Sequence, residues 1–137
     1  MSEPKADAAR AVMEAVSNRQ LDVLLGRCHD DVEWYSFFAG LNESGAYRGH
    51  AGLRQYVADM DETFEIVHAE VEDEVVVGDV VVLVGQIRYR GKESGLDDSM
   101  PAGWMLKFRG DKVLVFRAFR EPEAVLEAVG SGPTRRG

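Results

Sequence analysis

Three histidines are the first side chains in this sequence that suit acid–base chemistry near neutral pH. His68, in the stretch "FEIVHAEVE", has the same strand parity as Phe64 and Ile66, whose apolar side chains should face the interior. An inward imidazole would serve as a general base, because its pKa lies close to the working pH. The alternative is a structural histidine whose nitrogens are satisfied by hydrogen bonds. His29 is expected to cap a helix end, and His50 to be exposed in the first turn of a helix.

Arg88 is the second candidate for catalysis, because it shares a strand face with Gln86 and Val84. Such polar groups set against apolar walls are typical of a small-molecule site. The expected lining of that site is mostly aromatic and apolar: Trp34, Tyr56, Met60, Gln86, Arg88 and Trp104. The alternative is that the aromatic rings only fill the interior as core side chains.

The stretch "AYRGHAGLRQYV" places Gly49, His50 and Gly52 at the start of a helix. Unpaired backbone N–H groups at such a start bind phosphate in some proteins, but a phosphate cradle also needs a preceding strand and a fuller glycine pattern. Its expected role is therefore a helix entrance. No metal is expected, because His29, His50 and His68 lie on different elements and Cys28 is the single cysteine. No organic cofactor is expected either.

The first part of the chain is predicted to be helical. Apolar residues at helical spacing predict a helix over 6–18, a second short helix from Leu21 to Cys28 and a longer one from Leu53 to Phe64. Between the second and third, the run "DDVEWYSFF" switches to β-branched and aromatic residues and predicts a strand.

The second half is predicted to be a sheet of long strands. Gly78-Asp79 and Gly110-Asp111 supply tight turns, and Gly91 to Gly95 is a looser connection. Several strands are apolar on both faces, so we expect helices to cover one face and a second subunit to cover the other. Pro122 is expected to open a last short helix that Gly130 ends. The predicted strands are 64–77, 80–90, 96–108 and 112–121.

Composition limits the classes of function. The chain has 137 residues, 45% of them hydrophobic, and a net charge of -8. This is enough for one domain with a real core, expected over 1–130, with a flexible tail over 131–137. The acidic balance argues against nucleic-acid binding, and no apolar run approaches the roughly 18 residues of a membrane span. The N-terminus shows no signal sequence, so a cytoplasmic location is expected.

Several segments in order carry a resemblance to a known family. They are "HDDVEWY", "YRGHAGLRQYV", "VGDVVVLVGQIRYRGKESG", "RGDKVLVFRAF" and "EPEAVLEAVG". Together they resemble the SnoaL-like branch of the nuclear transport factor 2-like superfamily, from about residue 6 to residue 130. The resemblance implies a cone-shaped α+β fold, with a mostly antiparallel curved sheet wrapped around the N-terminal helices. It also implies a pocket on the concave face and dimers formed through the convex face.

The resemblance does not choose one activity, because the superfamily includes isomerases, cyclases, epoxide hydrolases and non-catalytic adaptors. The carboxylate base of the steroid isomerases would fall on Trp34, and their tyrosine close to Met13. The acid–base aspartate of the polyketide cyclases would fall in 117–120, which holds no acid, and Glu121 lies too near the strand end. For the Asp-Arg-Asp set of the epoxide hydrolases, Arg88 would supply the cation, but two matching carboxylates are missing. The acidic residues near the loop are expected to be solvated: Glu93, Asp97 and Asp98.

The chain is therefore expected to be a homodimer that holds a small, largely apolar molecule, a cyclic or polyketide-like metabolite, in the cone. If it is an enzyme, isomerisation, cyclisation or hydration by acid–base chemistry is expected, with His68 or Arg88 as the catalytic group. The alternative is a non-catalytic dimeric module whose cavity is filled by its own side chains. A third hypothesis, an adaptor that binds partner proteins through the convex sheet, would require a monomer.

Overall fold

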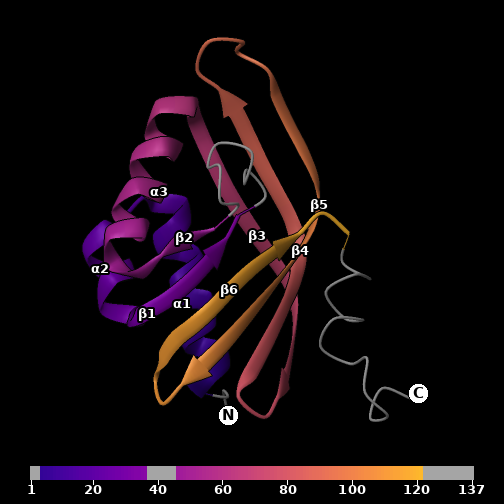
Figure 1. Cartoon of the computed structure of the whole chain (residues 1–137). Coiled ribbons are helices and arrows are strands. Elements are labelled where there is room, and N and C mark those ends of the chain that lie inside the picture. The colour runs from indigo at the N-terminus through magenta and orange to yellow at the C-terminus, as the bar shows by residue number, and fades with distance from the viewer. Residues whose placement is uncertain (1–3, 37–45, 122–137) are drawn as a thin grey trace.

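A computed structural model of the chain describes residues 4–36 and 46–121, in an α+β arrangement with three helices and six strands (Figure 1). The predicted helices and long strands are present close to their predicted boundaries. A two-residue strand, β2, was not predicted. The predicted strand residues Phe37 and Phe38, the helix over 122–130 and the tail over 131–137 lie outside the described residues. The elements are α1 (Pro4–Asn18), α2 (Leu21–Arg27), β1 (Cys28–Tyr35), β2 (Tyr47–Arg48), α3 (Gly49–Thr63), β3 (Phe64–Val77), β4 (Val80–Gly91), β5 (Asp97–Arg109) and β6 (Lys112–Phe119).

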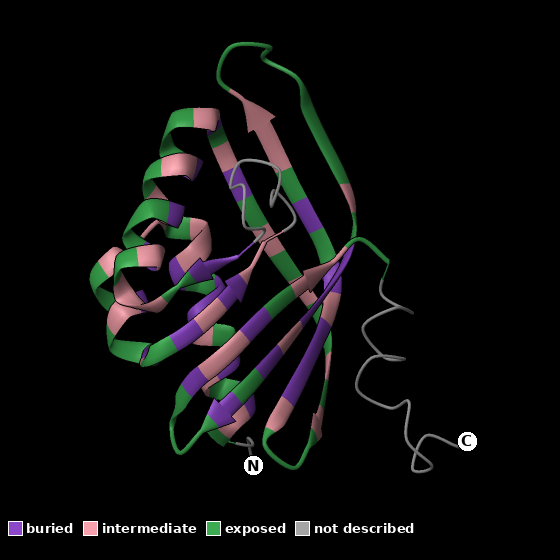
Figure 2. Cartoon of the chain, in the orientation of Figure 1, coloured by how far each residue is buried: buried purple, intermediate pink, exposed green. Residues whose placement is uncertain are grey.

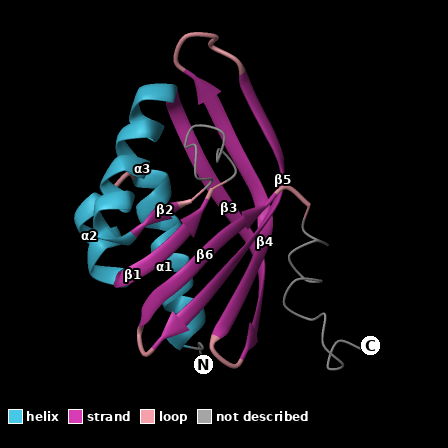
Figure 3. Ribbon diagram, viewed as in Figure 1, coloured by secondary structure: helices cyan, strands magenta, loops and turns pink. Residues whose placement is uncertain are grey.

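The strands form one sheet in the order β2-β1-β6-β5-β4-β3. All neighbouring strands are antiparallel except β1 and β6, which are parallel. The three helices lie together on one side of this sheet (Figure 3). The expected fold class, α+β with helices against a curved and mostly antiparallel sheet, is therefore confirmed.

The apolar stripes of the helices hold them against the sheet. In α1, Val12 and Met13 are buried, and in α3 the residues at helical spacing, Leu53, Tyr56 and Met60, are buried. Helix α1 lies along the edge strand β3, where the Ser17 hydroxyl accepts a hydrogen bond of 2.9 Å from the Ala69 backbone N–H. This contact satisfies a donor that an edge strand otherwise leaves unpaired.

The entrance of α3 is fixed to β1. Gly49 has a positive φ of 67°, and a β-carbon built on it would lie 3.2 Å from the Asp30 carbonyl oxygen. The neighbouring His50 places Nε2 3.0 Å from the Cys28 carbonyl oxygen. Glycine is needed here because left-handed backbone and close approach both disfavour a side chain. The glycine-rich stretch "AYRGHAGLRQYV" thus forms a helix entrance.

The core lies between the helices and the concave face of the sheet. Figure 2 shows buried positions along the middle of the strands and on the helix faces turned toward them, while the hairpin ends are exposed. Two irregularities bend β3 against β4, one between Phe64 and Ile66 and one between Val71 and Asp73. None of the helices within 4–36 and 46–121 is long and apolar enough to cross a membrane.

Candidate functional site

The interior wall is built from two buried tryptophans and the rings beside them. Trp34 on β1 is 0% exposed and stacks on Phe116 of β6, with ring centroids 3.8 Å apart and planes at 6°. Tyr56 of α3 packs on the same indole at 5.3 Å. Trp104 on β5 is 1% exposed and points to the same interior. Tyr56, Met60 and Trp104 therefore have the inward orientation that their spacing predicted, and Trp34 has the one that the resemblance implied. Their role in ligand binding stays a prediction.

These side chains leave little space between them. The cavity between the helices and the concave face measures about 10 Å³, close to the minimum for one water molecule. Its lining is apolar apart from two hydroxyl groups: Met13, Val16, Ser36, Tyr56, Val67, Ala69, Ile87, Trp104, Phe116 and Ala118. A metabolite larger than a water molecule would need these side chains to move.

Tyr56 is the titratable group of this interior. Burial raises its pKa to about 12, and the Trp34 N–H and the Ser36 hydroxyl partly offset that increase by their orientation toward the phenol oxygen. Trp34 Nε1 nevertheless makes no hydrogen bond of ordinary geometry within the described part of the chain. Tyr56 is thus a neutral hydrogen-bonding group at physiological pH, and it does not act there as a base.

The inward orientation expected for His68 is wrong. Its side chain is exposed, whereas its neighbours Val67 and Ala69 line the interior cavity. The irregularity between Phe64 and Ile66 inserts one residue into β3, so the side chains from there to Val71, where a second irregularity follows, change face. His68 is therefore turned away from the interior cavity. It lies at the edge of the sheet, in a groove that it lines together with Ser17 of α1 and with Arg88, its partner on β4.

The interior placement expected for Gln86 and Arg88 is also wrong. Both are exposed, and the inner face of this part of β4 belongs to Ile87 and Tyr89. The Arg88 guanidinium lies 3.3 Å from a carboxylate oxygen of Asp97, which Arg90 also contacts at 2.8 Å. Hydrogen bonding from Arg88, and then from Arg90, lowers the pKa of Asp97. These residues form a surface ion-pair network outside the cone.

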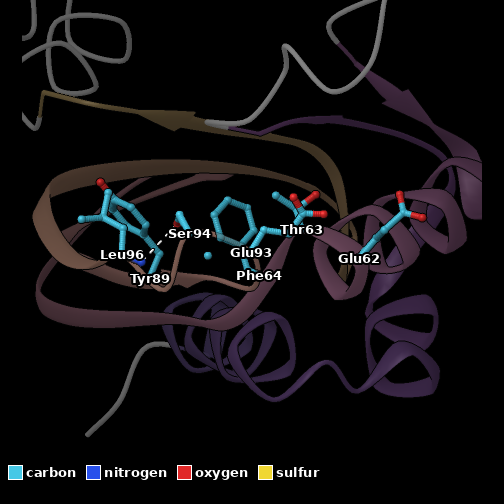
Figure 4. Close-up of a pocket in the computed structure, with 8 residues that line it drawn as sticks. Glu62, Thr63, Phe64, Tyr89, Glu93, Ser94 and Leu96 are labelled. Carbon is cyan, nitrogen blue, oxygen red and sulfur yellow. Dashed lines mark hydrogen bonds between the residues drawn. The ribbon is translucent and has the colours of Figure 1, made fainter.

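A larger opening lies at the rim of the cone, and sequence reasoning missed it. This cleft, the rim cleft, has a volume of about 670 Å³ and lies where the end of α3, the start of β3 and the β4–β5 hairpin meet (Figure 4). Phe64 and Tyr89, with centroids 6.2 Å apart and planes at 79°, supply its aromatic surface. Among the described residues, its lining is Glu62, Thr63, Phe64, Tyr89, Gly91, Glu93, Ser94 and Leu96.

Backbone hydrogen bonds fix the rim cleft in place. The Lys92 N–H donates to the Thr63 carbonyl at 3.1 Å, which ties the hairpin to the end of α3. Within the hairpin, the Gly91 N–H donates to the Leu96 carbonyl at 3.1 Å, and the Ser94 hydroxyl accepts from the Leu96 N–H at 3.1 Å. Tyr89 lies two residues beyond Ile87 on the inner face of β4, so the cleft continues the concave surface toward the rim. No group of three metal-ligating side chains occurs in residues 4–36 and 46–121.

Known proteins share this fold. A protein of the nuclear transport factor 2-like type from Burkholderia pseudomallei, of unknown function, superposes with a TM-score of 0.78 at 15% identity, covering 92% of this chain and 97% of that one. TerC, co-crystallised with polyporic acid, superposes with a TM-score of 0.75 at 21% identity, covering 91% of this chain and 97% of that one. A protein with a ketosteroid isomerase-like fold from Catenulispora acidiphila, in complex with trimethylamine, superposes with a TM-score of 0.72 at 17% identity. The match covers 87% of this chain and 88% of that one.

At these identities the structural likeness shows the fold. No curated protein matches the sequence. The sequence profile of the SnoaL-like domain, however, matches residues 9–117, which include most of α1, the other two helices, the interior wall and the rim cleft. The chain is a member of the SnoaL-like domain family.

Proposed function

We propose that this SnoaL-like protein binds a small, largely apolar organic molecule, of a cyclic or polyketide-like kind, in the rim cleft. The observation that carries the proposal is the size and surface of that cleft, about 670 Å³ with an aromatic pair and an exposed leucine, Leu96. Small-molecule sites range from about 300 to 1,000 Å³ and are mostly apolar with a few polar groups. The interior cavity of about 10 Å³ is far below that range.

Similar solved structures support a binding role for the fold. One was crystallised with polyporic acid and another with trimethylamine, both small organic molecules. In this chain the groups of the rim cleft that are available to exchange a proton with a bound molecule are the carboxylates of Glu62 and Glu93. Any acid–base isomerisation, cyclisation or hydration is assigned to these groups in preference to His68 and Arg88, which line neither the interior cavity nor the rim cleft.

Weakening the aromatic surface should weaken binding without unfolding the protein. A ligand-observed NMR screen of aromatic and alicyclic fragments is expected to give hits, and Tyr89→Ala and Leu96→Ser should each reduce their affinity about fivefold to tenfold, since each removes about 1 to 1.4 kcal/mol of apolar contact. Val77→Ser is the matched control, because Val77 is an exposed apolar residue at the opposite end of the sheet's long strands. If all three variants changed the affinity of the hits equally, the proposal that they bind in the rim cleft would be wrong.

The alternative is a non-catalytic module whose interior is filled by its own side chains. The small interior cavity is the observation that favours it. Native mass spectrometry of the purified protein, followed by denaturation and extraction, separates the two hypotheses. A releasable small molecule supports the binding function, whereas an empty protein together with a screen without hits supports the module.

We also propose that two copies associate through the convex face, as the resemblance implies. This face carries the apolar side chains of Val75 on β3, Val84 on β4 and Met105 on β5. At its two borders lie residues of opposite charge, Asp73 on β3 and Arg117 on β6. In a two-fold symmetric contact between two copies, the acidic border of one copy can face the basic border of the other. Val84→Lys is therefore expected to convert a dimer to a monomer in sedimentation equilibrium.

Gln86→Lys, on the same strand face but already polar and exposed, is the control for this substitution. It should leave the dimer intact. A wild-type protein that sediments as a monomer would contradict the proposed dimer and favour the adaptor hypothesis.

A further inference from the structure

We infer that the rim cleft selects organic cations, so that its ligand is a small amine attached to an aromatic or other apolar body. This inference rests on the proposed function, because it names the chemical class that binds at the same site. It is carried by three features of the cleft: the geometry of its two rings, the two carboxylates beside them, and the lack of a basic side chain in its lining.

The two rings provide a surface that attracts a cation. Phe64 and Tyr89 meet edge to face at 79°, so the electron-rich face of one ring is set against the edge of the other. A cation over a ring face is attracted by the ring quadrupole. In Figure 4 the Phe64 ring occupies the middle of the cleft, with Tyr89 and Leu96 on the hairpin side and Glu62 on the α3 side.

The carboxylates of the rim cleft have no cation of their own. Glu62 and Glu93 make no ion pair or hydrogen bond within residues 4–36 and 46–121. Nearby acids are paired, since Asp61 contacts Arg19 at 2.7 Å and Glu65 contacts Arg90 at 3.8 Å. The two glutamates that line the cleft are thus available to a charged ligand.

The described part of the lining offers no cationic side chain that would attract an anion. Within residues 4–36 and 46–121, no Lys, Arg or His lines the cleft. Two basic residues of the hairpin flank Gly91. Arg90 pairs with Glu65 and Asp97, and Lys92 is exposed and contributes its backbone N–H to Thr63. The chain's net charge of -8 adds a negative potential around the opening. An aromatic surface, two carboxylates and this potential together favour a cation over a neutral or anionic molecule of equal size.

Three probes of similar shape test the inference: 2-phenylethylamine, which is charged at pH 7.5, neutral 2-phenylethanol and anionic 3-phenylpropanoate. Their affinities are measured by chemical-shift titration of the backbone amides of 91–96 in about 20 mM salt, where screening is weak. The amine is expected to bind roughly tenfold more tightly than the alcohol, a difference of about 1.4 kcal/mol, and the carboxylate more weakly than both. In about 0.5 M salt the preference should shrink to a few-fold.

Charge-neutralising variants assign the preference to the cleft. The double variant Glu62→Gln with Glu93→Gln should reduce the amine's advantage over the alcohol to about twofold while the alcohol binds as before. Glu14→Gln with Glu70→Gln is the control, because it removes the same charge from two exposed positions outside the cleft. This control should retain most of the tenfold preference.

The outcomes separate the inference from the proposed function. If the alcohol binds the cleft as tightly as the amine, or the carboxylate binds best, the cation selectivity is wrong while the binding function stands. If the control double variant loses the preference as fully as the cleft variant does, the selectivity comes from net charge and the inference is wrong. If none of the three probes shifts the amides of 91–96, both proposals fail.

Discussion

Replacing Trp34 by alanine is expected to lower the free energy of unfolding by about 4 kcal/mol, within the range of large-to-small changes in packed cores. The indole is 0% exposed and stacks on Phe116 at 3.8 Å, and Tyr56 packs on it at 5.3 Å. Removing the indole leaves a cavity. The surrounding side chains are held in place by helices and strands, so they cannot move into the cavity without a large cost in free energy. Urea denaturation followed by far-UV circular dichroism measures the loss.

Trp34→Phe is the matched control for this prediction. It keeps an aromatic ring on Phe116 and removes an indole N–H that has no hydrogen-bond partner among the described residues. The decrease in the free energy of unfolding should be less than half of that caused by Trp34→Ala. If the alanine variant lost less than about 1 kcal/mol, Trp34 would not be the packed centre of the interior, and the small size of the interior cavity would be in doubt.

This result matters for function because the resemblance to the superfamily would place the base of the steroid isomerases at Trp34. A stacked and buried indole at that place supports the interior as a structural core in this chain. The small molecule is therefore sought at the rim, where Phe64 and Tyr89 line a cleft of about 670 Å³.

The positions of the elements could be predicted because their periodicity is strong. The stripe of α3 appears in the sequence at helical spacing, and its residues Leu53, Tyr56 and Met60 are buried. The tight turns at Gly78 and Gly110 have positive φ values of 59° and 65°, as their Gly-Asp pairs indicated. Local sequence determines such features, so no partner element is needed to find them.

The faces of the strands could not be predicted with the same success. Alternation shows which residues share a face, but an inserted residue changes the face of everything after it. The insertion near Glu65 in β3 leaves no mark in the composition, and His68 was therefore placed inside. In β4 both faces are apolar, so parity alone did not reveal that Arg88 lies on the outer one.

The rim cleft was missed because three separated segments form it. Residues 62–64, 89–91 and 93–96 meet through the pairing of β3 with β4 and through the bond from the Lys92 N–H to the Thr63 carbonyl. One signal was present in the sequence, the Gly91 to Gly95 connection followed by the apolar Leu96. Leu96 is 59% exposed, and an exposed leucine next to a fixed turn marks a surface that can bind.

Gly85→Ala is expected to destabilise the protein by about 3 kcal/mol, an unusually large effect for one added methyl group. A β-carbon built on Gly85 would lie 1.9 Å from the Glu70 carbonyl oxygen and 3.0 Å from the Glu72 nitrogen. Both atoms belong to the backbone of β3, beside the irregularity between Val71 and Asp73. The methyl group fits only if β3 moves away from β4, because backbone atoms cannot rotate aside as a flexible side chain can.

The same displacement should reach the rim cleft, since β3 begins with Phe64, which lines it, and since β3 contacts α1 through Ala69 and Ser17. Gly26→Ala is the control: Gly26 lies in α2 with no atom within 4 Å of the added carbon, so this change should stabilise by about 0.5 to 1 kcal/mol. Opposite signs for the two glycines in urea denaturation would support the close approach of β3 and β4. A loss below about 1 kcal/mol for Gly85→Ala would mean that the two backbones are further apart, and that the curvature that brings Phe64 to the hairpin has another origin.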